Sequence, residues 1–374
     1  WNTTKDLLMA VPVDNTTGYS YQFQNFGKTS NRGIELSVNV DVINKGDFRF
    51  NVGAIYNYNR NKLDELPNAD QYLYSSYWGS SSLVPTNDYM FVEGKAIGLV
   101  RGFISEGYYT VDDFNYTNGQ YVLKEGVPDI TKALTATYMH PYDLPAGQTA
   151  FPGAAKFRDV DESGTVDLDD ATCLGEVMPR HTGSFQLNFN YKNFDLSTNF
   201  NWTAGGKVYN VAAMINASGQ EFDGIGAQRA SWVADAFKVY NVNAAGDLYA
   251  VTNPDELRAL NANAKYHLPY HQSGITSSEW LENGSYLRLQ TLTLGYTLPK
   301  NWLTKVHVDK IRLYLTATNL FTITGYSGID PEVNANPTGQ SGFYSDLRIF
   351  PTLNMDFGTY PRARTFTFGA NITF

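Results

Sequence analysis

Strict alternation of apolar and polar residues constrains the fold of this chain more than any other feature. Residues 184–192 place Phe185, Leu187, Phe189 and Tyr191 on one side and mostly polar residues on the other. Because successive side chains of a β-strand point to opposite faces, this pattern predicts a strand with one apolar and one polar face. The same pattern predicts strands near residues 33–43, 47–59, 184–192, 194–203, 285–298, 310–321 and 363–374.

The lengths of these strands and of their connections favour a barrel in a membrane. The strands have about 9–12 residues, the length that crosses a bilayer at a tilt, whereas strands of soluble domains have about 5–6. Short turns join the strands in pairs, and the long segments 61–183, 203–284 and 322–362 follow the pairs. Outer-membrane barrels have short periplasmic turns and long extracellular loops. We therefore predict an all-β fold, a transmembrane antiparallel β-barrel with long extracellular loops.

The composition fits a surface that faces lipid and excludes several other classes of protein. Aromatic residues make up 14% of the 374 residues, and charged residues make up 17%, below the ~25% usual in soluble domains. The net charge of -9 argues against nucleic-acid binding. The single cysteine, Cys173, excludes an intrachain disulfide framework and a cysteine-based zinc cluster. We expect Tyr191, Phe194 and Trp202 in the aromatic girdles at the membrane interfaces.

A calcium-binding pattern occupies residues 159–170, which read DVDESGTVDLDD. Residues with side-chain oxygens fall at positions 1, 3, 5, 9 and 12, glycine stands at position 6, and position 7 offers a backbone carbonyl. This is the spacing of an EF-hand type loop, except that position 12 is aspartate instead of glutamate. We predict a structural Ca²⁺ held by Asp159, Asp161, Ser163, Thr165, Asp167 and Asp170. The alternative is a solvated acidic turn without an ion.

Two further features bear on function. The aromatic stretch QYLYSSYW, residues 71–78, would suit a sugar or peptide surface, so Tyr74, Tyr77 and Trp78 are candidate substrate contacts. Packing between loops is the alternative for this stretch. The five histidines are scattered, and no zinc-protease, nucleophile-elbow or phosphate-loop motif occurs in the sequence. We therefore expect no enzymatic activity.

Five stretches, in this order along the chain, resemble the SusC/RagA-type TonB-linked outer-membrane transporters. They read NRGIELSVNV, KFRDVDESGTVDLDDATCLGEVMPRHTGSFQLNFNYKNFDLSTNFNW, GSYLRLQTLTLGYTLPK, IRLYLTATNLFTITGYSGIDPEV and YPRARTFTFGANITF. Together they span nearly the whole chain, and the residues before the first stretch also look like the corresponding segment of that family.

The resemblance implies that residues 1–374 are the C-terminal part of a plugged barrel of about 22 strands and supply the last ~8 of them. The plug domain would lie outside this chain. The resemblance also implies active import of oligosaccharides or peptides across the Gram-negative outer membrane, driven by the TonB complex through the missing N-terminal region. A SusD-like surface lipoprotein would be the partner, and a dimer of such pairs is left open.

Two alternatives to this transporter stay open on the sequence alone. One is a secreted soluble all-β module that binds or hydrolyses glycans and carries a dockerin-like calcium loop. The other is a passive porin, which differs from a transporter by lacking the plug.

Overall fold

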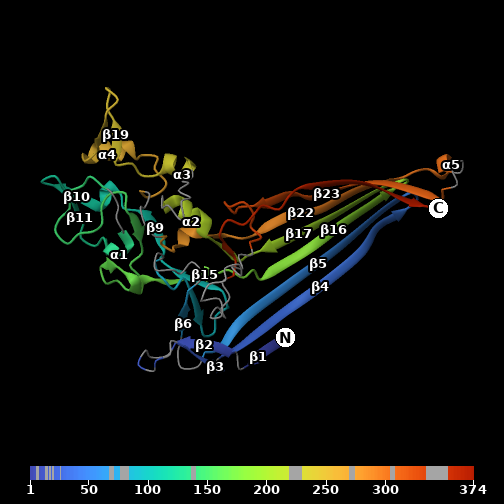
Figure 1. Cartoon of the computed structure of the whole chain (residues 1–374), viewed down its shortest axis with the longest axis horizontal. Coiled ribbons are helices and arrows are strands. Elements are labelled where there is room, and N and C mark those ends of the chain that lie inside the picture. The colour runs from blue at the N-terminus through green and yellow to red at the C-terminus, as the bar shows by residue number, and fades with distance from the viewer. Residues whose placement is uncertain are drawn as a thin grey trace.

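A computed structural model describes residues 1–5, 8–12, 16, 18, 21–25, 27–66, 71–75, 84–135, 140–218, 230–268, 274–303, 308–333 and 353–374. An eight-stranded antiparallel sheet dominates this structure, and its strands lie side by side along the longest axis (Figure 1). In sheet order the strands are β1 (Asn2–Lys5), β4 (Lys28–Lys45), β5 (Phe48–Glu65), β16 (His181–Tyr191), β17 (Phe194–Ala204), β22 (Tyr286–Thr297), β23 (Lys310–Thr324) and β25 (Thr365–Thr373).

The sheet contains a strand at each of the seven predicted positions, and β1 adds a short eighth strand at one edge. The first hairpin differs from the expectation at both ends. Residues 61–65, assigned to a long loop, belong to β5, where Leu63 pairs with Thr29. They lack the alternation because this end of the hairpin extends past the length that a bilayer covers. The turn is shorter than predicted, since only Gly46 and Asp47 separate the two strands.

The turns between paired strands gather at one end of the sheet, where α5 (Lys300–Leu303) and the C-terminus also lie (Figure 1). Gly46 turns the first hairpin with φ +58° and Lys192 turns the second with φ +52°. This left-handed conformation costs glycine little, which explains the glycine of the first turn.

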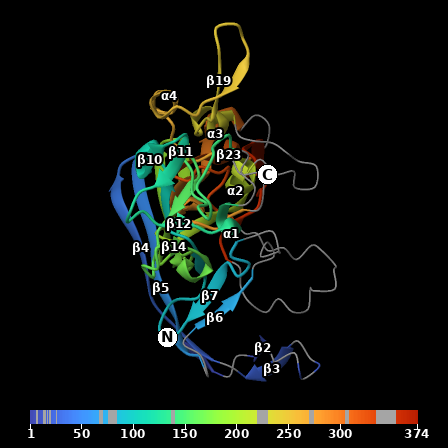
Figure 2. The same ribbon diagram turned by 90° about the vertical axis from the view of Figure 1, so that its left-hand side faces the viewer.

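The segments predicted as long loops fold together at the opposite end of the sheet, and we call this part the head (Figures 1 and 2). We define the head as the described residues within 71–180, 206–283, 326–333 and 353–360. It is therefore a packed unit rather than a set of separate loops. None of the helices in the described ranges is long and apolar enough to cross a membrane.

Short strands and helices make up the head. Its strands are β6 (Gln71–Tyr74), β7 (Tyr89–Val92), β8 (Leu99–Gly102), β9 (Ser105–Tyr108), β10 (Phe114–Thr117), β11 (Gln120–Leu123), β12 (Asp129–Ile130), β13 (Ala155–Phe157), β14 (Thr165–Val166), β15 (Thr172–Glu176), β18 (Lys207–Asn210), β19 (Tyr240–Val242), β20 (Leu248–Ala250), β21 (Leu281–Asn283) and β24 (Met355–Asp356). Its helices are η2 (Val111–Asp113), α1 (Lys132–Thr135), η3 (Leu168–Asp170), α2 (Val211–Ser218), α3 (Ala230–Asp235), α4 (Pro254–Leu260) and η4 (Ser278–Trp280). Outside both parts, β2 (Leu8–Pro12) pairs with β3 (Tyr21–Asn25).

Two apolar clusters form the interior of the head. One surrounds Tyr89 and Tyr209, and the other surrounds Phe103 and Tyr109; all four side chains are fully buried. Burying side chains of this size removes a large apolar area from water, so these clusters stabilise the head as the core of a soluble domain does.

Candidate functional site

The outward face of the sheet carries an unbroken apolar row. Cross-strand pairing places apolar side chains of seven neighbouring strands in line: Ile43, Phe50, Phe189, Leu196, Leu294, Leu315 and Phe368. The rings of Phe50 and Phe189 stack with centroids 4.3 Å apart. Phe366 and Phe368 are 64% and 74% exposed, so no other part of the described chain covers this face at β25. The face is built to contact lipid.

The inward face carries a polar row that is one residue from the apolar row on every strand except β4, where the register shift between Asp41 and Ile43 makes the separation two. It consists of Asp41, Asn51, Asn188, Ser197, Thr293, Thr316 and Thr367. Hydrogen bonds link neighbours within the row: Asn51 donates to Asp41 (2.9 Å), Ser197 donates to Asn188 (2.6 Å), and the hydroxyls of Thr293 and Thr316 lie 2.9 Å apart. Side chains of this kind line the wet interior of an outer-membrane barrel.

The aromatic residues predicted for the interfaces lie near the ends of their strands. Tyr191 and Phe194 flank the turn of β16 and β17 and are 52% and 53% exposed. Trp202 lies toward the head end of β17, where its ring stacks with Tyr56 at 6.1 Å. Exposed rings at the turn end suit the boundary between lipid and water.

An ion pair near the turn end spans three strands of the inward face. Arg312 of β23 donates to Asp195 of β17 at 2.5 Å, although β22 lies between them. The strand between them contributes Gly295 at this level, and a Cβ there would lie 2.4 Å from a carboxylate oxygen of Asp195. The glycine thus leaves the space that the ion pair occupies. Sequence reasoning missed this pair, because its members are 117 residues apart.

A second charged cluster, also missed, joins the sheet to the head. The Arg288 side chain is 2% exposed and donates to Asp330 (2.5 Å) and Glu332 (3.0 Å). Arg362 also contacts Glu332 at 2.9 Å. This cluster therefore fastens β22 to residues near both ends of the connection between β23 and β25. A buried arginine needs such partners, since an unpaired buried charge is costly.

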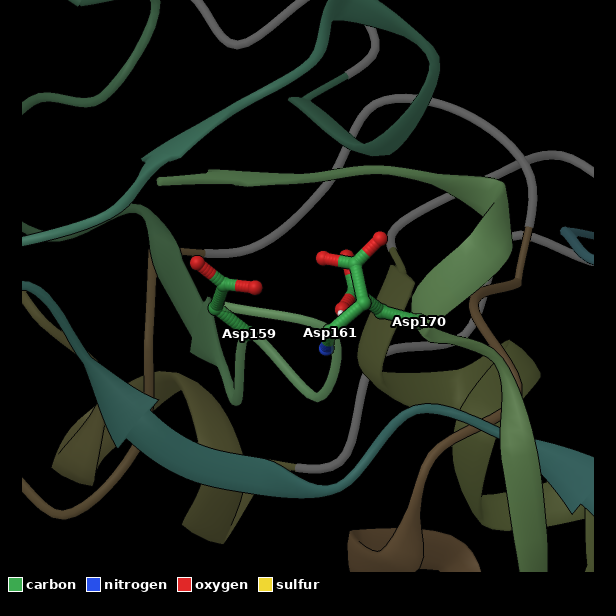
Figure 3. Close-up of side chains that lie close together, drawn as sticks. All are labelled: Asp159, Asp161 and Asp170. Atoms are coloured by element: carbon green, nitrogen blue, oxygen red, sulfur yellow. Dashed lines mark hydrogen bonds between the residues drawn. The ribbon is translucent and has the colours of Figure 1, made fainter. Parts of the chain in front are cut away.

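Three of the six predicted calcium ligands come together in the structure. Asp159, Asp161 and Asp170 each offer a carboxylate oxygen within 4.8 Å of the others, and Figure 3 shows them gathered at the loop. Gly164 turns the loop with φ +85°, a conformation that favours glycine. The backbone N–H of Gly164 donates to Asp159 (2.7 Å), so the loop is folded around its first carboxylate.

The other three predicted ligands, Ser163, Thr165 and Asp167, form hydrogen bonds within the loop. Asp167 accepts a hydrogen bond from the backbone N–H of Asp169 (2.8 Å) and caps η3. The carbonyl of Thr165 accepts from the Ser163 hydroxyl at 3.0 Å. Hydrogen bonds from the backbone and side chain of Ser163 lower the pKa of Asp161. The possible metal ligands are carboxylate oxygens and a backbone carbonyl oxygen. These are the hard oxygen ligands that calcium prefers, so the chemistry of this loop fits a calcium ion.

Of the predicted substrate contacts, Tyr74 belongs to the described part of the chain, and it does not lie on an exposed surface. Tyr74 is 5% exposed, and its ring stacks on Phe91 with centroids 4.7 Å apart in the interior of the head. The packing alternative therefore describes Tyr74, whose burial also raises its pKa. Tyr77 and Trp78 lie outside the described residues and stay predictions.

A pair of titratable groups lies beside a buried aromatic cluster of the head. His267 Nε2 lies 3.8 Å from Glu279 Oε2, and His267 packs edge-on against Trp232. Burial lowers the pKa of His267 to about 4 and raises the pKa of Glu279 to about 7. Both shifts favour the uncharged form of their group. Sequence reasoning missed this pair, because no motif in the sequence links His267 to Glu279.

Comparison with known proteins relates the whole chain to part of larger receptors. No protein-family model matches the chain. It is 30% identical over 372 residues to TonB-dependent receptor P3 of Formosa agariphila and 25% identical over 381 residues to TonB-dependent receptor SusC of Bacteroides thetaiotaomicron. Each match covers 99% of the chain but only 31% and 29% of the relative. The chain thus spans about a third of the length of the curated relatives it matches.

Solved structures agree with this relationship. The chain matches a structure of the RagAB peptide transporter with a TM-score of 0.64 at 21% identity, covering 100% of the chain and 32% of that protein. The RagAB peptide importer in the closed-closed state gives a TM-score of 0.63 with the same coverage. This likeness concerns the fold, and it confirms the predicted fold class, a portion of an antiparallel outer-membrane barrel.

Proposed function

We propose that this chain, a portion of a SusC/RagA-type TonB-dependent transporter, serves the active import of oligosaccharides or peptides across the outer membrane of a Gram-negative bacterium. The observation that carries the proposal is the pair of rows, apolar outward and polar inward, that continues through seven strands. Such a sheet holds lipid on one side and a wet lumen on the other. Similarity to TonB-dependent receptors over 99% of the chain supports energy-driven transport.

We propose two protein partners for this transporter. One is a SusD-like surface lipoprotein at the head, and the other is the TonB complex, acting through a part of the protein outside the barrel. The similarity to SusC and to the RagAB peptide importer supports both. A dimer of transporter–lipoprotein pairs is a further proposal, which the mass of the complex purified in mild detergent would test.

The exposed apolar face argues against a secreted soluble module. Ile34 and Phe368 are 69% and 74% exposed on the outward face of the sheet. In water such a continuous face would favour aggregation, whereas in a bilayer it is solvated by lipid.

Uptake by whole cells tests the import proposal. A strain that lacks the transporter gene is complemented with the full-length gene and offered mixtures of labelled neutral oligosaccharides or labelled short peptides. We expect the complemented strain alone to accumulate one of the two classes, and a protonophore to abolish that accumulation. Uptake that continues with the protonophore would favour a passive porin, and uptake of neither class would contradict the substrate class.

We also propose that the 159–170 loop binds a structural Ca²⁺ through Asp159, Asp161 and Asp170, with Ser163, Thr165 and Asp167 completing the shell. An ion that binds only the folded state stabilises it by about 2.7 kcal/mol at 100 times its Kd. We expect calcium to raise the unfolding temperature of the full-length protein, and Asp170→Asn to remove that increase. The exposed neighbour Asp169 provides the control, because Asp169→Asn should keep the calcium response. An equal response of both variants would contradict the site.

A further inference from the structure

A cavity of about 430 Å³ lies on the head and belongs to none of the sites described above. It is formed where η2, β10 and β11 meet α4, in the part of the molecule farthest from the turn end (Figures 1 and 2). Its lining combines aromatic rings with amide, carboxylate and basic side chains; the ones used below are Asp112, Asn115, Tyr116, Tyr121, Lys124 and Arg258. The volume lies within the range of small-ligand sites, and the lining is more polar than in most of them.

The β10–β11 hairpin presents a tyrosine ring at the mouth of the cavity. Asn118 and Gly119 join its strands, and their φ angles of +52° and +84° fit the two-residue turn that Asn-Gly favours. The pairing then sets Tyr116 opposite Tyr121, with ring centroids 4.9 Å apart. Tyr121 is 1% exposed, whereas Tyr116 is 43% exposed. A buried ring therefore supports an exposed ring, which can offer an aromatic surface to a ligand.

The charged side chains of the cavity largely neutralise one another. Arg258 donates to Asp112 at 2.8 Å and to Asp255 at 2.9 Å. Lys124 donates to the backbone carbonyl of Asp112 at 2.6 Å. The carboxylate of Asp112 is 74% exposed, so it can accept further hydrogen bonds from a ligand. Compensated charges of this kind favour a neutral ligand that is rich in hydroxyl groups over a charged one.

We propose that this cavity binds a neutral oligosaccharide at the surface of the head, in a site separate from the lumen of the barrel. A pyranose ring has an apolar C–H face that can pack on Tyr116 and hydroxyl edges that can bond to Asp112, Asn115 and Arg258. The site would hold glycan at the cell surface whether or not that glycan is the transported substrate. It therefore does not depend on the import function proposed above.

Binding of neutral oligosaccharides to the full-length protein in detergent tests this proposal. Saturation-transfer NMR and calorimetry with mixed neutral, uronate-containing and peptide ligands would identify the preferred class. We expect a neutral oligosaccharide to bind and Tyr116→Ala to weaken that binding at least about tenfold, because the variant removes the aromatic surface. Asp112→Ala should also weaken it, since it removes the exposed acceptor.

Tyr240 provides a matched control because it is 44% exposed on the β19–β20 hairpin of the same head, outside the lining of the cavity. Tyr240→Ala should leave oligosaccharide binding unchanged. Binding that is insensitive to Tyr116→Ala, a preference for uronates or peptides, or an absence of binding to any neutral oligosaccharide would each overturn the proposal. Circular dichroism and the unfolding temperature of each variant confirm that a loss of binding does not reflect unfolding.

Discussion

Placing an arginine at Leu187 tests the assignment of the two faces most directly. Leu187 lies on the outward face of β16, between Val52 and Thr198 of the neighbouring strands, five residues before the turn residue Lys192. Five residues of strand rise roughly 16 Å, or about 12 Å along the membrane normal at a tilt of ~40°. This depth is close to the middle of an apolar band ~25 Å tall. An arginine at the midplane costs about 2–4 kcal/mol.

Two matched variants complete the series. Asn188→Arg changes the adjacent residue on the inward face, where the lumen solvates the charge. It should therefore lose only the hydrogen bond from Ser197 (2.6 Å) and the longer one to Asn51 (3.5 Å), together about 1–2 kcal/mol. Tyr191→Arg changes an outward residue beside the turn, where the cost of an arginine falls to about 0–1 kcal/mol.

Unfolding by guanidinium in lipid vesicles measures the three free energies in the full-length protein. We expect Leu187→Arg to lower the free energy of unfolding most, and to reduce the folded fraction seen as heat-modifiable migration in gels. Equal losses from Leu187→Arg and Asn188→Arg would refute the assignment of faces. A loss from Tyr191→Arg as large as that from Leu187→Arg would refute the assignment of depth.

Three further predictions concern the charged and titratable groups. Removing the buried arginine with Arg288→Met leaves Asp330 without its partner and should lower the free energy of unfolding by about 3–5 kcal/mol in the same guanidinium assay; a loss below 1 kcal/mol would contradict the role of that cluster. Gly295→Ala should cost about 1–3 kcal/mol, since its Cβ would lie 2.4 Å from the Asp195 carboxylate, and an unchanged unfolding midpoint would exclude that crowding. Between about pH 4.5 and 6.5 the folded head binds an extra proton at Glu279, whose pKa is raised to about 7, and one fewer at His267, whose pKa is lowered to about 4. The contribution of Glu279 to the free energy of unfolding therefore falls with rising pH, whereas the contribution of His267 rises. The two contributions oppose each other. His267→Gln should therefore make the unfolding temperature fall as pH rises through this window, and Glu279→Gln should make it rise; parallel profiles for both variants would contradict the assigned pKa shifts.

The strands of the sheet could be predicted from the sequence because the membrane enforces one rule at every residue. The bilayer demands an apolar outward side chain and tolerates polar inward ones, so alternation marks each strand and its faces. The register shift between Leu289 and Thr291 was missed. The sequence does carry its signal, because the apolar residues Leu287 and Leu289 alternate out of phase with Leu292. A change of phase within one run of alternation indicates a β-bulge.

The charged contacts of the site could not be predicted, since each depends on a pairing between distant segments. Asp195 and Arg312 read as ordinary polar positions of two separate strands, and only the fold brings them together across Gly295. The calcium loop is the opposite case, because its three converging carboxylates lie within twelve residues and share one turn. Local spacing therefore predicts a local site, whereas the ion pairs require the topology first.

The head shows how tyrosines of the long connections can form a core, as Tyr74 does. Short strands and irregular segments leave many backbone carbonyls unpaired, and buried carbonyls need a hydrogen-bond donor. Tyrosines of the two apolar clusters supply it: Tyr89 donates to Leu353 (2.9 Å), Tyr109 to Pro128 (2.7 Å) and Tyr121 to Thr252 (2.8 Å). Tyrosine fills the core with its ring and satisfies the backbone with its hydroxyl, which phenylalanine or leucine cannot do. In this protein an abundance of tyrosine in long connections therefore indicates an irregular core first, and a binding surface only where a ring stays exposed, as at Tyr116.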